Sequence, residues 1–294
     1  MATDVIRALH RSFGTKAGAM APQWVVNKYQ RWTTDVYVVS FPKSGRTWFR
    51  TILGTVLQLR FGTDAVDPSS IHHMWKLDRR VPRITFTHDM NAHLISSERV
   101  SWSGNLYSGK KTILLVRDPR DTIVSLYYEM TKRVHAYEGT IESFISQDSG
   151  GIASLVAFLN DWCRNRERLS RLHLICYEDI HASPLPTIAG ALEFAGITGT
   201  PDAIIEQAIE RCSLDAMRRM ELSGAVPHVR LRPGDASDPE SYKVRKGKVG
   251  GYAETLSAAD CDFLDKYIYD HLDEGFARYR LPPCDGARGS DAAA

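Results

Sequence analysis

Two cations, two hydroxyl residues and a glycine stand together where the chain could bind an anion. They follow a β-rich run at 35–41 and precede a helical pattern: Lys43, Ser44, Gly45, Arg46 and Thr47. The first backbone N–H groups of a helix have no partner within the helix and attract anions. Gly45 allows close backbone approach, and the cations and hydroxyls can add charge-assisted hydrogen bonds. This loop predicts an anion site, although an ordinary strand-to-helix connection with Lys43 and Arg46 in solvent fits the loop alone equally well.

The order of these residues differs from that of an ordinary nucleoside-triphosphate loop. In the pattern GxxxxGK[ST] the lysine follows the last glycine, and a hydroxyl binds magnesium. Here Lys43 precedes Gly45. A P-loop-like kinase or nucleotidase therefore remains an alternative that fits the loop poorly, and we expect no metal site.

A second candidate anion site combines an arginine and a serine. Arg117 closes the β-rich run at 112–116, and Ser125 follows eight residues later in a helical pattern. Both can therefore face a ligand above the sheet edge. The alternative is that Arg117 pairs with Asp118 or Asp121 and that Ser125 merely occupies a helix.

His88, in the segment RITFTHDM, is a candidate general base. It follows the β-rich run at 83–87, and histidine titrates near neutral pH. A lone histidine is more often structural or exposed, and the adjacent pair His72 and His73 is a rival. The position at a strand end favours His88.

Short β-rich runs alternate with helical patterns as far as residue 176. The β-rich runs span 35–41, 83–87, 112–116 and 172–176, and apolar residues recur at helical spacing over 47–60, 122–134 and 154–169. This alternation predicts an α/β fold: a single domain with a parallel sheet flanked by helices and a P-loop-like phosphate-binding strand, loop and helix. Ligands bind beyond the carboxyl ends of parallel strands. We therefore expect convergence of the residues that follow the four runs, among them Lys43, His88, Arg117 and Tyr177.

The later part of the chain is less periodic. The stretch 223–252 is rich in glycine, proline and charge, which indicates an irregular loop at the cofactor or acceptor site. A single helix is predicted over 257–279. We expect one domain over 1–283, with a helical N-terminal extension at 1–34, and a flexible tail at 284–294.

The bulk composition excludes several classes of protein. Apolar residues make up 43% and charged residues 24% of the chain, which is typical of a globular protein. Lys and Arg outnumber Asp and Glu by only 37 to 35, so we expect no nucleic-acid partner. No segment approaches the roughly 20 apolar residues of a transmembrane helix, and the first residues lack the apolar core of a secretory signal. The five cysteines include no CxxC pair, so we expect a cytoplasmic protein.

The segment FPKSGRTW resembles the 5'-phosphosulfate loop of the cytosolic-type sulfotransferases, usually written YPKSGTTW. These enzymes use 3'-phosphoadenosine 5'-phosphosulfate (PAPS). The resemblance implies that Lys43 contacts the bridging oxygen and the 5'-phosphate, and that Thr47 and the loop amides hold this phosphate. It also implies that Trp48 stacks on adenine, whereas packing of the helix onto the sheet is its alternative role. The departures are Phe41 for Tyr and Arg46 for Thr.

Two motifs resemble the 3'-phosphate site of the same family. Arg117 and Ser125 match an arginine at a strand end and a serine eight residues later. The segment RKGKVGGY is similar to RKGxxGDW, whose Arg, Lys and Gly bind this phosphate. The residues that match are Arg245, Lys246 and Gly247.

Weaker similarities concern the adenine and the base. Tyr177 begins YED, whose tyrosine hydrogen-bonds the adenine in the family, and Ser213 belongs to CSLDAM, which resembles TSFxxM. His88 matches the histidine of the family's KTH segment, but Phe86 stands in the lysine position. Arg46 is the candidate to replace the missing charge.

The resemblance implies a sulfotransferase that moves a sulfuryl group from PAPS to an alcohol or phenol hydroxyl of a small or lipid-like acceptor. Adenosine 3',5'-bisphosphate (PAP) is the product, His88 the general base, and Lys43 the group at the bridging oxygen. A non-catalytic nucleotide-binding module is the other alternative, although the presence of both residues favours an enzyme. A monomer and a homodimer are both open. Several large apolar residues either line an acceptor pocket or pack in the core: Met74, Trp75, Met90, Trp102, Tyr107 and Met220.

Overall fold

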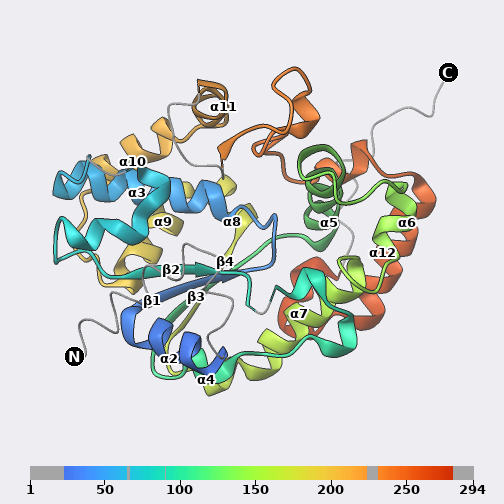
Figure 1. Ribbon diagram of the computed structural model, residues 1–294, viewed down its shortest axis with the longest axis horizontal. Helices are drawn as coiled ribbons and strands as arrows, with labels where there is room; N and C mark the ends of the chain where they lie inside the picture. Colours follow the sequence, from blue (N-terminus) through green and yellow to red (C-terminus); the bar gives the residue numbers. More distant parts are fainter. Residues whose placement is uncertain (1–22, 65–66, 90, 224–230, 281–294) are drawn as a thin grey trace.

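The computed structural model describes residues 23–64, 67–89, 91–223 and 231–280. Figure 1 shows a sheet in the middle of the molecule with helices on both of its faces. The predicted α/β class is confirmed. The expected helical extension is described only from residue 23 onward, and the expected tail at 284–294 lies outside the described residues.

The sheet has four strands in the order β2-β1-β3-β4, and all three pairings are parallel. The strands are β1 Val36–Ser40, β2 Ile84–Thr87, β3 Lys111–Val116 and β4 Leu172–Cys176. Val38 lies opposite Phe86 on β2 and opposite Ile113 on β3. Each strand falls within a predicted β-rich run or one residue outside it, so these runs are confirmed.

The helices also follow the sequence pattern in most places. In chain order they are α2 Gln23–Thr33, α3 Arg46–Phe61, α4 Gly104–Tyr107, α5 Pro119–Tyr128, α6 Ile141–Ile145, α7 Ile152–Asn165, α8 Tyr177–Ala182, α9 Pro184–Ala195, α10 Asp202–Arg211, α11 Leu214–Ser223 and α12 Ala258–His271. Short 3₁₀ segments lie between them, the longest at Pro68–Lys76.

Alternate residues of β1 point into two separate cores. Tyr37 and Val39 pack into a cluster that includes residues of α5, α7 and α12. Val36 and Val38 pack into a second cluster with residues of α3, α9 and α10. Because strand side chains alternate between the faces of a sheet, one fully buried strand serves both layers.

The predicted helix at 122–134 is in fact two elements. It starts earlier, at Pro119, because Asp118 caps the helix by accepting a hydrogen bond from the Arg120 N–H at 2.8 Å. After Tyr128 the backbone continues as a π-helix over Glu129–Arg133. Such π-turns often occur at functional sites.

The prediction of one helix over 257–279 is wrong. Helix α12 ends at His271, Leu272 is extended, and a 3₁₀ segment follows at Glu274–Tyr279. Asn160 of α7 causes the break: its amide donates to the His271 carbonyl at 2.7 Å and accepts from the Asp273 N–H at 2.7 Å. A tertiary contact therefore satisfies the backbone groups at the end of α12.

The stretch predicted to be irregular, 223–252, is described from residue 231 onward, and short 3₁₀ turns lie in it at Pro239–Ser241 and at its end, Gly251–Glu254. It is drawn in orange in Figure 1, where it passes between α11 and α5. The carboxylate of Glu221, which is buried, accepts hydrogen bonds from the backbone N–H groups of Lys243 at 2.5 Å and Val244 at 3.1 Å. This contact holds the segment against α11.

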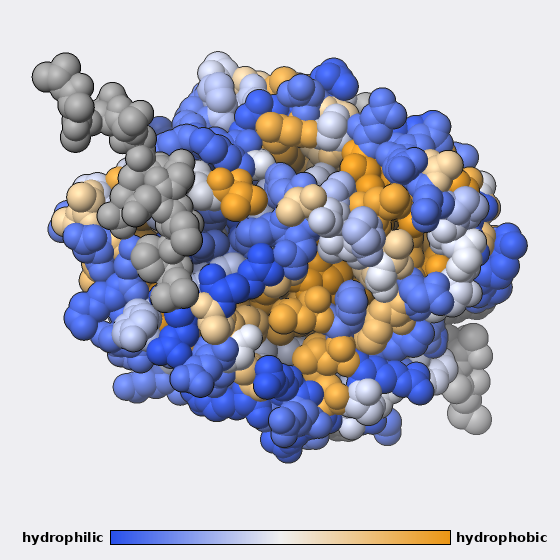
Figure 2. Space-filling model, turned by 180° about the vertical axis from the view of Figure 1, so that it is seen from behind, coloured by the Kyte–Doolittle hydropathy of each residue, from blue (hydrophilic) through white to orange (hydrophobic). Residues whose placement is uncertain are grey.

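The surface opposite the view of Figure 1 is mostly hydrophilic at its rim, with apolar side chains gathered toward the middle (Figure 2). Within the ranges that the structure describes, no helix combines the length and the apolar character needed to cross a bilayer. Among the same residues, no three His, Cys, Asp or Glu side chains are grouped so that they could hold a metal ion.

Candidate active site

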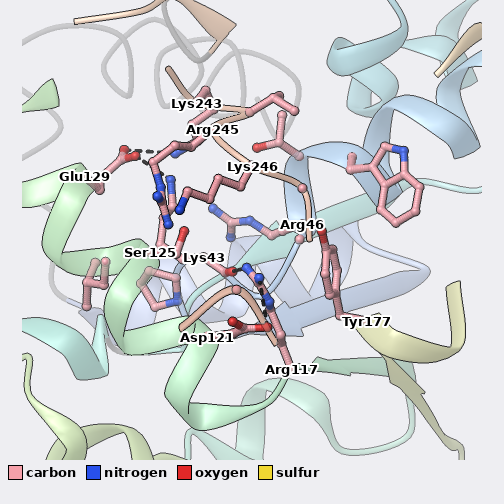
Figure 3. A pocket seen from close by; sticks show the side chains of 18 of the residues that line it. Lys43, Arg46, Arg117, Asp121, Ser125, Glu129, Tyr177, Lys243, Arg245 and Lys246 are labelled. Atoms are coloured by element: carbon pink, nitrogen blue, oxygen red, sulfur yellow. Dashed lines mark hydrogen bonds and ion pairs between the residues drawn. The ribbon is translucent and has the colours of Figure 1, made fainter. Parts of the chain in front are cut away.

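A pocket of about 280 Å³ lies beyond the carboxyl ends of the strands (Figure 3). Residues that follow each of the four strands line it, as the sequence predicts: Lys43 after β1, His88 after β2, Arg117 after β3 and Tyr177 after β4. The other predicted residues in its lining are Gly45, Arg46, Thr47, Trp48, Ser125, Arg245, Lys246 and Gly247. Ser44 and Ser213 are not part of it.

The loop after β1 is shaped by a left-handed turn at the start of α3. Gly45 precedes the helix with φ of 86°, and a Cβ atom there would lie 2.3 Å from the Tyr177 ring. Only glycine fits both requirements. Lys43 also has a positive φ, 69°, which is uncommon for a residue with a side chain. The hydroxyl of Ser44 donates to the Phe41 carbonyl at 3.0 Å and is buried, so it does not face the pocket as predicted.

The ammonium of Lys43 contacts a carboxylate that the sequence analysis did not single out. Glu129, the first residue of the π-helix, accepts hydrogen bonds from Lys43 at 2.7 Å, Lys243 at 2.9 Å and Arg133 at 2.5 Å. The exposed fractions of these side chains are 20% or less. Three cations therefore contact one carboxylate, and Lys43, Glu129 and Lys243 of this cluster line the pocket.

The charged groups of this cluster shift one another's pKa values. Burial opposes ionisation of Glu129, but Lys43, Lys243 and Arg133 outweigh it and hold the pKa of Glu129 well below its usual value. Burial lowers the pKa of Lys43, and its contact with Glu129 offsets only part of this effect. Burial and the charge of Lys43 lower the pKa of Lys243 to about 7.

Arg117 links three parts of the site. Its guanidinium donates to the carbonyls of Lys43 at 3.3 Å and Lys248 at 3.0 Å, and it lies 4.4 Å from the centre of the Tyr177 ring. It also pairs with Asp121 at 3.3 Å, as the alternative reading of its role proposed. The pairing does not remove Arg117 from the pocket, because both residues line it.

Asp121 attaches the segment that contains Arg245 to helix α5. Its carboxylate accepts from the backbone N–H groups of Gly250 at 2.8 Å and Tyr252 at 2.9 Å, and the residue is 3% exposed. The Arg245 guanidinium lies over the Tyr128 ring, 4.1 Å from its centre, and pairs with Glu240 at 2.9 Å. The RKG residues thus line the same pocket as Arg117 and Ser125.

His88 is oriented as a neutral imidazole. Its Nδ1 lies 2.9 Å from the Ser40 carbonyl, which can only accept, so Nδ1 carries the proton. Its Nε2 then accepts from the Arg46 guanidinium at 2.5 Å. Burial and the nearby Arg46 hold the pKa of His88 well below its usual value. The rival pair His72 and His73 is exposed on the 3₁₀ segment at 68–76, outside the pocket lining.

The residues predicted to contact adenine lie at one end of the pocket. Trp48 donates its indole N–H to the Cys212 carbonyl at 2.8 Å, and its ring centre lies 5.7 Å from that of Tyr177. This contact joins the segment CSLDAM to Trp48, although none of the segment's residues lines the pocket. Ser213 itself is exposed, and its hydroxyl accepts from the Ala216 N–H at 3.4 Å at the start of α11.

The large apolar residues considered for the acceptor pocket are part of the core where the structure describes them. Met74 and Tyr107 are fully buried, and Trp75, Trp102 and Met220 pack against the two core clusters. Met90 lies outside the described residues. The pocket is lined instead by residues that include His93, Leu126, Met130 and Val134, and the ring centre of His93 lies 5.8 Å from that of His88.

Three functional candidates were missed. Asp121 follows Arg117 by four residues, and Glu129 follows Ser125 by four, so helical spacing places both next to predicted residues and could have indicated them. Lys243 gives no such signal, because the stretch around it has no periodicity.

The parallel sheet, the loop at the start of α3 and the clustered cations define a nucleotide-binding α/β domain with a P-loop-like anion site. The chain belongs to the sulfotransferase family, whose sulfotransferase domain matches residues 33–276. Family membership confirms the predicted class of enzyme and its donor, PAPS.

Similar proteins span most of the chain. Flavonol 3-sulfotransferase of Flaveria bidentis is 23% identical over 257 residues, which cover 81% of each protein. Sulfotransferase 1A1 of Mus musculus is 25% identical over 267 residues, 82% of this chain and 86% of that protein.

Two solved structures share the fold. A mouse sulfotransferase complexed with PAP superposes with a TM-score of 0.56 at 20% identity, covering 81% of this chain and 84% of that one. Retinol dehydratase in complex with retinol and PAP gives a TM-score of 0.58 at 16% identity, covering 82% of each chain.

Proposed function

We propose that this pocket transfers the sulfuryl group of PAPS to the hydroxyl of a small acceptor, with His88 as the general base. One observation carries the proposal: His88 and Lys43 line the same cavity as residues of both predicted phosphate sites. A proton acceptor, a cation for the leaving oxygen and two anion sites are the parts that this reaction requires.

The residues present fit the donor. The N-terminus of α3 and Thr47 suit the 5'-phosphate, and Arg117, Ser125 and Arg245 suit the 3'-phosphate. Trp48 and Tyr177 offer aromatic surface to adenine. The donor supplies the sulfuryl group and leaves as PAP.

His88 accepts the proton of the acceptor hydroxyl as the new S–O bond forms. The Ser40 carbonyl fixes the Nδ1–H tautomer, so the lone pair of Nε2 is available for this proton once Arg46 withdraws from it. The depressed pKa keeps the imidazole neutral before the reaction.

Lys43 stabilises negative charge on the bridging oxygen as the S–O bond to the donor breaks. For this its ammonium turns from Glu129 toward the oxygen. Arg46 supplies the charge that the family's KTH lysine would give at position 86. Phe86 instead lies under the guanidinium of Arg50, at 4.1 Å, and neither residue lines the pocket.

The direct test is a screen of alcohols, phenols and hydroxy acids with radiolabelled PAPS. We expect a labelled product with the wild-type protein and a loss of kcat of at least about 100-fold in His88→Ala and Lys43→Ala. Full turnover by His88→Ala contradicts the role of the base. Circular dichroism of each variant controls for folding.

A thermal-shift comparison separates the alternatives. We expect PAP to raise Tm, because it binds only the folded protein. Stabilisation by ATP with magnesium, and not by PAP, supports a kinase. Stabilisation by PAP without turnover of any acceptor supports the non-catalytic module.

A further inference from the structure

A buried carboxylate that the proposed reaction does not use follows the base directly. Asp89 is 5% exposed and does not line the pocket. Its carboxylate accepts hydrogen bonds from the Tyr107 hydroxyl at 2.8 Å and from the Trp162 indole N–H at 3.1 Å. Burial raises the pKa of Asp89, and its hydrogen bonds offset only part of this effect. Movement of Asp89 would leave buried polar groups without partners, so the contacts hold this residue firmly.

The two donors come from helices that are packed in the core. Tyr107 belongs to α4 and Trp162 to α7, and both side chains are buried. Their ring centres lie 5.1 Å apart, and Tyr107 also packs edge-on against Tyr37 of β1 at 5.1 Å. Close packing of these rings leaves them little freedom to move. The core therefore presents a preformed anchor to the carboxylate of Asp89.

The backbone at Asp89 turns sharply at the end of β2. Its φ of 42° is uncommon for a residue with a side chain, although aspartate tolerates it better than most. Its N–H donates to the hydroxyl of Thr87, the last residue of β2, at 3.1 Å. Such a conformation persists where the surrounding contacts determine it. The residues on both sides of His88 are thus tied to each other, and the carboxylate of Asp89 ties them to the core.

The orientation of His88 depends on where this turn places its backbone. The Nδ1–H of His88 donates to the Ser40 carbonyl at 2.9 Å, which leaves Nε2 to accept a proton. If the turn after β2 shifts, the imidazole can separate from Ser40 and lose the tautomer and the direction that a general base needs.

We propose that Asp89 is a positioning residue for sulfuryl transfer: its carboxylate, held by Tyr107 and Trp162, fixes the turn that directs His88 toward the acceptor hydroxyl. This inference rests on the proposed function, because it concerns the base. The residues that suit the donor lie on elements other than β2 and its turn. Loss of the anchor therefore lowers kcat and leaves the affinity for PAP unchanged.

Tyr107→Phe tests the anchor, since it removes one hydroxyl and keeps the ring that packs in the core. Turnover is measured with radiolabelled PAPS and 2-naphthol as the probe acceptor, and PAP binding by calorimetry. We expect kcat to fall about tenfold, because small displacements of a reacting group are costly, while the Kd of PAP stays within about twofold. An unchanged kcat overturns the inference.

Tyr279→Phe is the matched control. Tyr279 is also buried, its hydroxyl donates to the carboxylate of Glu178 at the same distance of 2.8 Å, and neither residue lines the pocket. Both substitutions should lower Tm, because each removes a buried hydrogen bond. We expect kcat to fall only in Tyr107→Phe. Equal losses of kcat in the two variants indicate general destabilisation and overturn the inference.

A His88→Ala background separates this inference from the proposed function. If Asp89 acts through His88, Tyr107→Phe lowers the residual turnover of His88→Ala no further. A further tenfold loss in that background overturns the inference and leaves the base in place. Full turnover by His88→Ala alone overturns the proposed base. Asp89→Asn, which keeps the size of the side chain, gives the same comparison if Tyr107→Phe does not fold.

Nuclear magnetic resonance of protein with isotope-labelled histidine, saturated with PAP, tests the inference without an acceptor. The ring signal that His88→Ala lacks belongs to His88. We expect the pKa of His88 to rise in Tyr107→Phe, because burial depresses it and a displaced ring is less buried. The other groups that act on this pKa, Arg46, His93 and Lys243, are the same in the variant. Identical titrations of His88 in the variant and the wild type overturn the inference.

Discussion

The carboxylate of Glu129 lies 2.7 Å from the ammonium of Lys43, so the lysine of the loop after β1 is held by the π-helical turn after α5. Glu129→Gln removes the carboxylate charge that pairs with Lys43, Lys243 and Arg133. We expect a loss of about 3 kcal/mol in the free energy of unfolding, the usual cost of breaking a buried ion pair. Urea denaturation followed by circular dichroism measures it.

Glu254→Gln is the control for this prediction. Glu254 also contacts two lysines, Lys246 and Lys248, but it is 45% exposed. Exposed ion pairs contribute little, so this variant should unfold at the same urea concentration as the wild type. Equal losses in both variants would show that burial of the Glu129 cluster has no role in stability.

The pH dependence of turnover should reflect the buried state of His88. Burial and Arg46 hold its pKa well below 6.5, so His88 stays unprotonated as the pH falls through the range where an exposed histidine gains a proton. We expect kcat/KM to remain constant down to about pH 6 and to fall only in more acidic solution.

Arg46→Thr should move this acidic limb to higher pH, because one of the two main causes of the depressed pKa is removed. The same variant should also lose kcat, since Arg46 is proposed to stabilise the sulfuryl group. If the acidic limb of the wild-type profile is centred near pH 6.5, the pKa of His88 is not depressed. If the limb has the same position in Arg46→Thr, Arg46 does not contribute to the depressed pKa.

Asp121→Asn should weaken donor binding more than it weakens the fold. The amide keeps the size of the side chain but loses the charge that holds the Gly250 and Tyr252 N–H groups and pairs with Arg117. We expect the Kd of PAP to rise about tenfold, measured by calorimetry. Asp260→Asn, which disturbs only the capping box of α12, should lower Tm without changing this Kd.

Gly45→Ala tests the geometry of the loop. Both Gly45 and Gly62 flank α3 with positive φ, but a Cβ at Gly62 meets no atom within 4 Å, whereas one at Gly45 lies 2.3 Å from the Tyr177 ring. We expect Gly62→Ala to cost about 1 kcal/mol of stability, and Gly45→Ala to cost more and to abolish PAP binding. Similar stability and PAP affinity in the two variants would rule out the clash.

The strands of the sheet and the site residues that directly follow them could be predicted, because the sequence patterns that indicate them are local. The four strands are short apolar runs, and Lys43, His88, Arg117 and Tyr177 follow them directly, so parallel topology alone brings them together. Arg117 and Ser125, and the residues from Arg245 to Gly247, were predicted from their spacing in two motifs, and all of them line this pocket.

The remaining features depend on contacts between distant residues. Asn160 ends α12 from a helix more than 100 residues earlier, and Glu221 fixes the backbone that presents Lys243. No periodicity records such contacts. Ser44 and Ser213 were predicted from their place in a motif, but their hydroxyls bond to nearby backbone groups instead of facing the pocket.

The contact between Asp121 and the N–H groups of Gly250 and Tyr252 has a consequence for synthesis of the chain. Most residues that line the pocket precede residue 131, but Arg245 to Gly247, which also line it, leave the ribosome more than 100 residues later. A nascent chain that stops short of this segment has the sheet and the base without a complete cradle for the donor. Donor affinity thus depends on nearly the full length of the domain, which keeps unfinished chains from binding PAPS productively.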